Sequence, residues 1–275
     1  MVSLFLVLFS AIELSLSEDN LQQGQVCYVK LVTDEQGLLS LTYRGEPYPL
    51  IPYKNYYISA IGTSYKTSCG RKAIKVYFSN SKRKLVIDTA IIVRPRKFRK
   101  SVIKLSSSKQ SAIDTSRQRR KKEEYKEVVA AINAPSIDFY SIYPEILPCR
   151  KNISGTYGDE RWANGKKLWN HSGLDFAVPK WTPILAPCVA KVIMARDTFI
   201  RQGNFVMLDH GAGLKTLYYH MVKRNVEEGD VVATGDTLGF VGSTGLSTGP
   251  HLHMSVYIHG IPVDPLYWLE KKEKP

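Results

Sequence analysis

The first third of the chain consists of short apolar runs separated by turn-forming residues. Between residues 24 and 93 the runs are rich in Tyr, Val, Ile and Thr, with turn signals between them. Such runs predict β-strands, because β-branched and aromatic side chains pack well on a pleated surface. Several short strands at this spacing predict a small β-sandwich, which we assign to residues 18–98.

The second half of the chain shows the same kind of pattern. Its apolar runs are bounded by Gly, Pro or Asp and predict antiparallel strands without a helix. The runs cover residues 183–187, 190–196, 204–209 and 214–220. We therefore predict a second, antiparallel β-rich domain over residues 141–275 and a chain that is predominantly all-β.

A basic segment separates the two predicted domains. Residues 94–122 contain twelve Lys or Arg and the single acid Asp114, so most of the formal net charge of +13 is concentrated there. Residues 117–132 have helical character, and Pro135 follows as a stop signal. We predict a basic linker and helix over residues 99–140.

The charge of residues 94–122 favours anionic partners, because clustered cations bind polyanions by releasing counterions. Aromatic residues suited to base stacking do not accompany the cations, which argues against nucleic acid. A solvated linker is the commoner use of this composition. If the segment does bind a polyanion, anionic envelope polymer or lipid headgroups are the expected partners.

Residues 2–16 are almost wholly apolar but too short to span a bilayer comfortably. The run ends in small residues at Ser15 and Ser17, as signal peptidase sites do. We predict a signal peptide over residues 1–17 and export to the periplasm or cell envelope. No cation precedes the run and Glu13 interrupts it, so a misassigned start or a retained anchor is the alternative.

Two cysteines lie in each half of the chain, Cys27 and Cys69 in the first and Cys149 and Cys188 in the second. No Cys-x-x-Cys spacing indicates a structural zinc or redox site. In an oxidising compartment the economical hypothesis is one disulfide within each half, although four cysteines allow three connectivities.

The candidate chemistry lies in the second half, which holds all six histidines. On a strand, His251 and His253 would project from one face, and His171 and Asp175 are four residues apart. Imidazoles and a carboxylate are ligands that zinc accepts. Each pair alone is weak, since hydrogen-bonded histidine pairs are common, but three such ligands would leave a fourth position open.

Three motifs in this order resemble the lysostaphin or LytM-type zinc endopeptidases, from about residue 142 to 268. The motifs are HSGLDF at residues 171–176, LYYHM at 217–221 and GSTGLSTGPHLH at 242–253. The β-sandwich resembles the immunoglobulin-like domain found ahead of some of these peptidases, with far less specific motifs. The resemblance implies a hydrolase that cuts amide bonds in the peptide cross-links of bacterial peptidoglycan.

Mapped residue by residue, the resemblance implies that His171, Asp175 and His253 hold one Zn²⁺ per chain. His220 and His251 would be the catalytic histidines, because no glutamate base of the His-Glu-x-x-His type is present. The sequence favours a structural role for His210 and a loop position for His259. The rival interpretations are a non-catalytic relative that binds the wall or activates another hydrolase, and an enzyme held shut by its own N-terminal part.

Trp162 and Trp169 belong to the turn-rich stretch that leads to His171. They could line a substrate groove or simply cover the core, and the sequence does not separate these alternatives.

Overall fold

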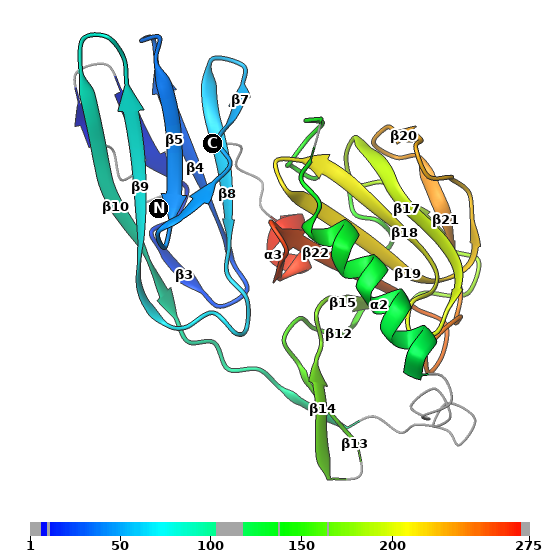
Figure 1. The fold of residues 1–275 in the computed structure, drawn as a ribbon. Coiled ribbons are helices and arrows are strands. Elements are labelled where there is room, and N and C mark those ends of the chain that lie inside the picture. The colour runs from blue at the N-terminus through cyan, green and yellow to red at the C-terminus, as the bar shows by residue number, and fades with distance from the viewer. Residues whose placement is uncertain (1–6, 10–11, 103–117, 137, 164, 271–275) are drawn as a thin grey trace. The chain divides into compact units, whose positions relative to one another are not determined.

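The computed structural model describes residues 7–9, 12–102, 118–136, 138–163 and 165–270, and Figure 1 shows its fold. The residues described up to Arg96 form one compact unit, and those from Lys97 onward form a second. Both units are built mainly from strands, which confirms the predominantly all-β prediction. Within the described residues, no helix has the length and apolar character needed to cross a membrane.

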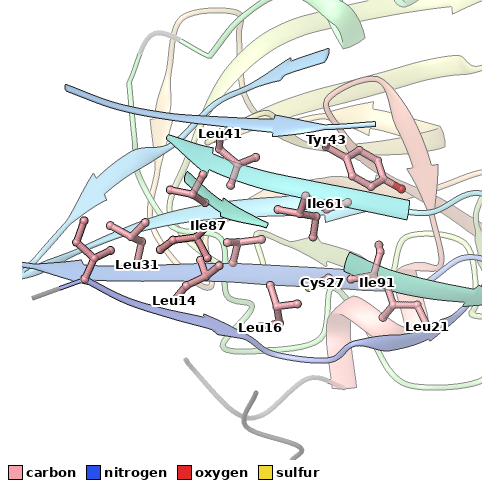
Figure 2. Packing of buried hydrophobic residues seen from close by; sticks show 14 of the residues in the cluster. Leu14, Leu16, Leu21, Cys27, Leu31, Leu41, Tyr43, Ile61, Ile87 and Ile91 are labelled. Carbon is pink, nitrogen blue, oxygen red and sulfur yellow. The ribbon is translucent and has the colours of Figure 1, made fainter. Parts of the chain in front are cut away.

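The first unit is a sandwich of two five-stranded sheets. One sheet contains, in order, β1 (Val7–Phe9), β2 (Ile12–Leu16), β4 (Val26–Thr33), β8 (Tyr56–Gly62) and β7 (Ile51–Tyr53). The other contains β3 (Asn20–Gln22), β10 (Lys84–Arg94), β9 (Gly70–Ser79), β5 (Leu38–Tyr43) and β6 (Glu46–Tyr48). Leu14 and Leu31 from the first sheet and Leu41 and Ile87 from the second share one buried core, as Figure 2 shows. The predicted β-sandwich is therefore confirmed.

Strand β2 lies within the stretch predicted as a signal peptide, residues 1–17. Ile12, Leu14 and Leu16 are almost completely buried, while Glu13 between them is exposed. The strand pairs with β4 along its whole length. The apolar run is thus a half-buried strand with period-two alternation at its end, and Glu13 is its solvent-facing residue. Export itself stays a prediction.

The predicted disulfides are wrong in this structure, where all four cysteines are free thiols. Cys27 is fully buried on β4, whereas Cys69 is exposed just before β9. Cys188 lies 3.2 Å from Nδ1 of His210, and burial raises the pKa of its thiol to about 12. Burial also raises the pKa of the Cys149 thiol to about 12, so both thiols of the second unit are protonated and unreactive.

The second unit is organised around a ten-stranded sheet whose pairings are all antiparallel, as predicted. Its main path runs through β12 (Ile153–Gly155), β15 (Leu174–Phe176), β22 (Leu252–Ile258), β19 (Leu214–Arg224), β18 (Gly203–Gly211), β17 (Ala190–Phe199) and β20 (Val231–Val232). Off this path lie β16 (Pro183–Leu185), β21 (Thr237–Val241) and β23 (Ile261–Val263).

A small sheet and a short helix also belong to the second unit. β11 (Lys100–Val102), β13 (Glu160–Ala163) and β14 (Lys166–Asn170) form a separate small sheet, in which β11 runs parallel to β13. A short helix, α3 (Pro265–Glu270), follows the last strand. The antiparallel prediction therefore holds for the large sheet, while the small sheet adds a parallel pair.

The predicted helix is present as α2 (Gln118–Asn133) and packs against the large sheet of the second unit. Its buried positions Glu124, Val128 and Ile132 are four residues apart and therefore lie on one helix face. Val128 and Ile132 join a core with residues of β17, β18 and β19. Residues 103–117, the middle of the predicted basic segment, lie outside the described residues.

If β2 is a core strand, Leu14→Ala should destabilise the sandwich. We expect the free energy of unfolding of this unit to fall by about 3 kcal/mol, because the substitution leaves a cavity in the core. Glu13→Ala, on the opposite face of the same strand, should change it by less than about 0.5 kcal/mol. Scanning calorimetry of the full chain measures both. An equal loss of unfolding free energy in the two variants would contradict the assignment of β2 to the core.

Candidate metal centre

Three predicted ligands come together where β15 pairs with β22. Asp175 lies directly opposite His253 in this antiparallel pair, so their side chains project from the same face. His171 reaches the same point from the residues before β15. Nε2 of His171, Oδ1 of Asp175 and Nδ1 of His253 lie 2.9–3.0 Å from one another. These residues form the one group in the described part of the chain with metal-binding spacing.

The imidazoles of His171 and His253 are each oriented by a hydrogen bond at the ring nitrogen that faces away from Asp175. Nδ1 of His171 lies 2.9 Å from the carbonyl oxygen of Thr156, which can only accept, so this nitrogen carries the proton. Nε2 of His171 is left with a lone pair facing Asp175 and His253. On His253, Nε2 lies 2.9 Å from Oγ of Ser255 and can donate to it, which frees Nδ1 in the same way.

The donor set fits a divalent cation. Three lone-pair atoms this close together repel one another unless a proton or a cation lies between them. Two ligand atoms about 2.0 Å from a tetrahedral zinc ion would be about 3.3 Å apart, close to the separations found here. Two neutral imidazoles and one carboxylate are a set that zinc accepts, and a fourth position would stay open to solvent.

The second carboxylate oxygen of Asp175 is held by Arg161 of β13. Nη2 of Arg161 donates to Oδ2 of Asp175 over 2.8 Å, and both side chains are largely buried. Nη1 of Arg161 donates to Oγ of Ser101. A Cβ atom at Gly155 would overlap both the carboxylate and the guanidinium, so a side chain at this position would displace the ion pair. The prediction from sequence gave Arg161 no role, although it lies in the stretch that leads to His171.

The same interactions decide the charge of Asp175. Burial raises its pKa, but hydrogen bonds and charge interactions with His171 and His253 outweigh burial and hold the pKa well below its usual range. Burial lowers the pKa of His253 to about 4, partly offset by Asp175. At neutral pH the aspartate is therefore ionised and the His253 ring neutral, which are the states that bind a metal.

A β-bulge brings His220 close to the same cluster. Two residues of β19, Tyr219 and His220, together oppose the single residue Phe205 of β18. Consecutive strand residues normally point to opposite faces, but φ at His220 is +64° and turns its side chain back. Both rings consequently approach His253, with centroid distances of 4.9 Å for Tyr219 and 6.1 Å for His220.

His220 and His251 are held in the same way, each by a hydrogen bond from its Nδ1 atom to a backbone carbonyl oxygen. Nδ1 of His220 donates to the carbonyl oxygen of Thr244 over 2.8 Å, and Nδ1 of His251 donates to that of Gly249 over 2.9 Å. Each ring is left with an Nε2 lone pair, and Nε2 of His251 lies 3.9 Å from Oδ1 of Asp175. Burial, followed by the nearby His251 and His253, lowers the pKa of His220 well below its usual range, so its ring is neutral.

The two remaining histidines lie outside the cluster. His210 is fully buried, with Nε2 2.8 Å from Oγ1 of Thr216 and its ring 5.8 Å from that of Trp268. His259 lies in the turn between β22 and β23. Both placements agree with the predicted positions.

The predicted aromatic residues Trp162 and Trp169 are both half-buried on the small sheet. Nε1 of Trp162 donates to Glu160, and the Trp169 ring lies under the guanidinium of Arg201 at 5.6 Å. The choice between groove wall and covering residue therefore stays open for Trp162, while Trp169 has a cationic neighbour at the cavity.

Comparison with known proteins gives one family for this region. The sequence model described as Peptidase family M23 matches residues 169–265, which include all five candidate ligand and catalytic residues. This agrees with the lysostaphin and LytM-type resemblance of the motifs.

Two curated relatives and one solved structure are similar to the chain. An uncharacterized metalloprotease of Haemophilus influenzae is 41% identical over 35% of this chain and 20% of its own length. The peptidoglycan DD-endopeptidase ShyA of Vibrio cholerae is 38% identical over 37% of this chain and 23% of its own length. The chain thus spans about a quarter or less of these relatives. A structure from Pseudomonas aeruginosa, described provisionally as an M23 peptidase, is 26% identical over 90% of this chain and 94% of its own, with a TM-score of 0.67.

Removal of the Arg161 side chain should weaken metal binding. We expect Arg161→Ala to lower zinc affinity about 10-fold to 100-fold, because partners of the ligands hold them in a binding geometry. Lys166→Ala, an exposed position on the neighbouring strand, is the matched control. Competition with a chromogenic chelator measures both affinities, and equal values would show that Arg161 does not orient Asp175.

The buried His210 should make the second unit acid-sensitive. Burial lowers its pKa from 6.5 to about 4, so the unfolded chain binds a proton that the folded chain does not. The resulting stability is fully present above pH 6.5 and is lost as the pH falls towards 4, by about 3 kcal/mol at most. All four tryptophans lie in this unit, so their fluorescence in urea reports its unfolding. His210→Phe should reduce the pH dependence in chelator-treated protein, and an unchanged dependence would refute this explanation.

Proposed function

The chain belongs to peptidase family M23 through residues 169–265, and from this membership we propose that it is a zinc-dependent endopeptidase acting on the peptide cross-links of bacterial peptidoglycan. The family makes the chain a hydrolase. The Vibrio cholerae relative is named as a peptidoglycan endopeptidase, which supports peptidoglycan as the substrate. The Haemophilus influenzae relative is named as a metalloprotease, which supports a bound metal ion as the cofactor. Action on a wall polymer would also require export to the periplasm or cell envelope.

The observation that carries the proposal is the convergence of His171, Asp175 and His253 at 2.9–3.0 Å. These residues would hold one zinc ion per chain and leave one corner of the tetrahedron for water or substrate. A zinc ion bound in this way lowers the pKa of a coordinated water to about 7 and polarises a carbonyl group.

His220 and His251 would carry out the proton transfers. Their Nδ1 atoms are held by backbone carbonyl oxygens, and the centroids of their rings are 4.8 Å apart. A neutral imidazole with its outer nitrogen fixed can accept a proton from the attacking water and later pass it to the leaving amine. Once protonated, the same ring can stabilise negative charge on the substrate carbonyl oxygen.

A non-catalytic relative that binds wall or activates another hydrolase is the alternative. Such a protein has no need for a complete set of ligands or for two correctly oriented imidazoles. Here all three ligand positions are filled by residues that bind metals, and Arg161 and Thr156 hold two of them in place. These features favour the enzyme. Binding of anionic envelope polymer or lipid by residues 94–122 stays a separate prediction.

The two histidine roles can be separated by measuring metal content and activity together. His253→Ala should lose both zinc and activity, whereas His220→Ala and His251→Ala should retain zinc and lose activity by about 100-fold or more. The assay digests purified sacculi, with and without a chelator, and identifies released fragments by mass.

His259→Asn is a matched control, because φ at this residue is +47° and Asn tolerates that conformation. This variant should keep both its bound zinc and its activity. Release of the same fragments by wild type and by His253→Ala would contradict the endopeptidase proposal.

A further inference from the structure

The turn between β17 and β18 is fastened to the segments that carry the catalytic histidines. The carbonyl oxygen of Arg201 accepts the N–H of Leu246, in the loop that precedes His251. The next carbonyl, that of Gln202, accepts the N–H of His220 over 2.9 Å. A Cβ atom at Gly245 would overlap the backbone of this turn, so the loop and the turn are in direct contact. The turn is therefore part of the wall around the metal centre.

The side chain of Arg201 is exposed on this turn and lies against aromatic rings of the centre. Its guanidinium carbon is 5.6 Å from the centroid of Trp169, two residues before the ligand His171. Burial raises the pKa of the Tyr219 hydroxyl, and the charge of Arg201 is close enough to oppose this. Tyr219 in turn stacks on the ligand His253 at 4.9 Å. Arg201 thus lies beside the aromatic neighbours of the metal centre, at a position that we call its rim.

Carboxylates around this rim are already paired with other cations. Asp175 pairs with Arg161, Asp159 with Arg99, and Glu160 with Lys167. Glu124, which accepts the N–H of Ile200 in the same turn, pairs with Arg120. Within the described residues, no carboxylate lies at ion-pair distance from Arg201. The guanidinium of Arg201 therefore has a ring contact with Trp169 but no ion-pair partner among the described residues.

We propose that Arg201, supported by the ring of Trp169, is a subsite for a carboxylate group of the substrate next to the scissile amide. A guanidinium presents paired N–H donors that match the two oxygens of a carboxylate. Because Arg161 balances the charge of Asp175, this aspartate adds no net repulsion towards a substrate carboxylate. This inference rests on the proposed peptidase function and narrows its substrate class to peptides that carry a free carboxylate near the bond to be cut.

Binding tests the subsite without requiring catalysis. The probes are N-acetyl-D-alanyl-D-alanine, whose free carboxylate lies next to its D-alanyl amide bond, and the same peptide as a carboxamide. The full chain is titrated with each probe, both zinc-loaded and chelator-treated, and the NMR signal of the Trp169 indole N–H is followed. We expect the wild type to bind the carboxylate about tenfold more tightly in both forms, since hydrogen bonds between charged groups reach this magnitude.

Three variants complete the test. Arg201→Gln should lose the preference, and Arg201→Lys should keep part of it, because the charge remains without the paired donors. Lys191→Gln is the control, since it removes the same charge at the start of β17, opposite Asp209, and should keep the full preference.

Equal binding of the two peptides by wild type, no detectable binding of either, or a preference that survives in Arg201→Gln would overturn the proposal. Digestion of sacculi by the same proteins tests the peptidase function separately. A preference for the carboxylate in a protein that releases no fragments would support the subsite while rejecting the peptidase.

Discussion

The second unit depends on one strand pairing, that of β15 with β22. It sets Asp175 opposite His253, and a shift of one residue would turn either side chain to the other face of the sheet. The buried neighbours of these residues hold the register, because Leu174 and Phe176 are buried on β15 and Leu252 and Met254 on β22. The hydrophobic core therefore fixes the geometry of the polar centre.

The bulge at His220 shows where the fold departs from regular structure to complete the site. A regular strand could direct either Tyr219 or His220 towards His253. Because the bulge sets both residues opposite Phe205, both rings approach His253. Left-handed backbone at a non-glycine residue costs roughly 1 kcal/mol or more, and the sheet on either side maintains it. The N–H of His220 donates to Gln202 and its ring to Thr244, so the strained residue is held from two sides.

The sequence predicted the elements better than it predicted the partners of the site. Periodicity located the sandwich, helix α2 and the large antiparallel sheet, since each depends on local alternation of apolar residues. The three proposed ligands were predicted from two local motifs, and the structure brings these residues together. Arg161, Arg201 and the bulge were missed because their roles depend on pairings between distant strands. The N-terminal run shows that apolar length alone does not separate a signal peptide from a buried strand, because Glu13 between two buried residues also indicates the alternation of a strand.

The arginine at Asp175 also has an electrostatic consequence for any metal held there. A carboxylate ligand alone would offset part of the charge of a divalent ion, and a buried unpaired aspartate would be costly. Because Arg161 balances Asp175 over 2.8 Å, the protein side of the centre carries no net charge when both imidazoles are neutral. The cavity then keeps a positive potential towards an incoming peptide carbonyl and towards a neighbouring carboxylate. Orientation of the proposed ligand Asp175 and attraction of the proposed substrate carboxylate would thus follow from the same buried ion pair.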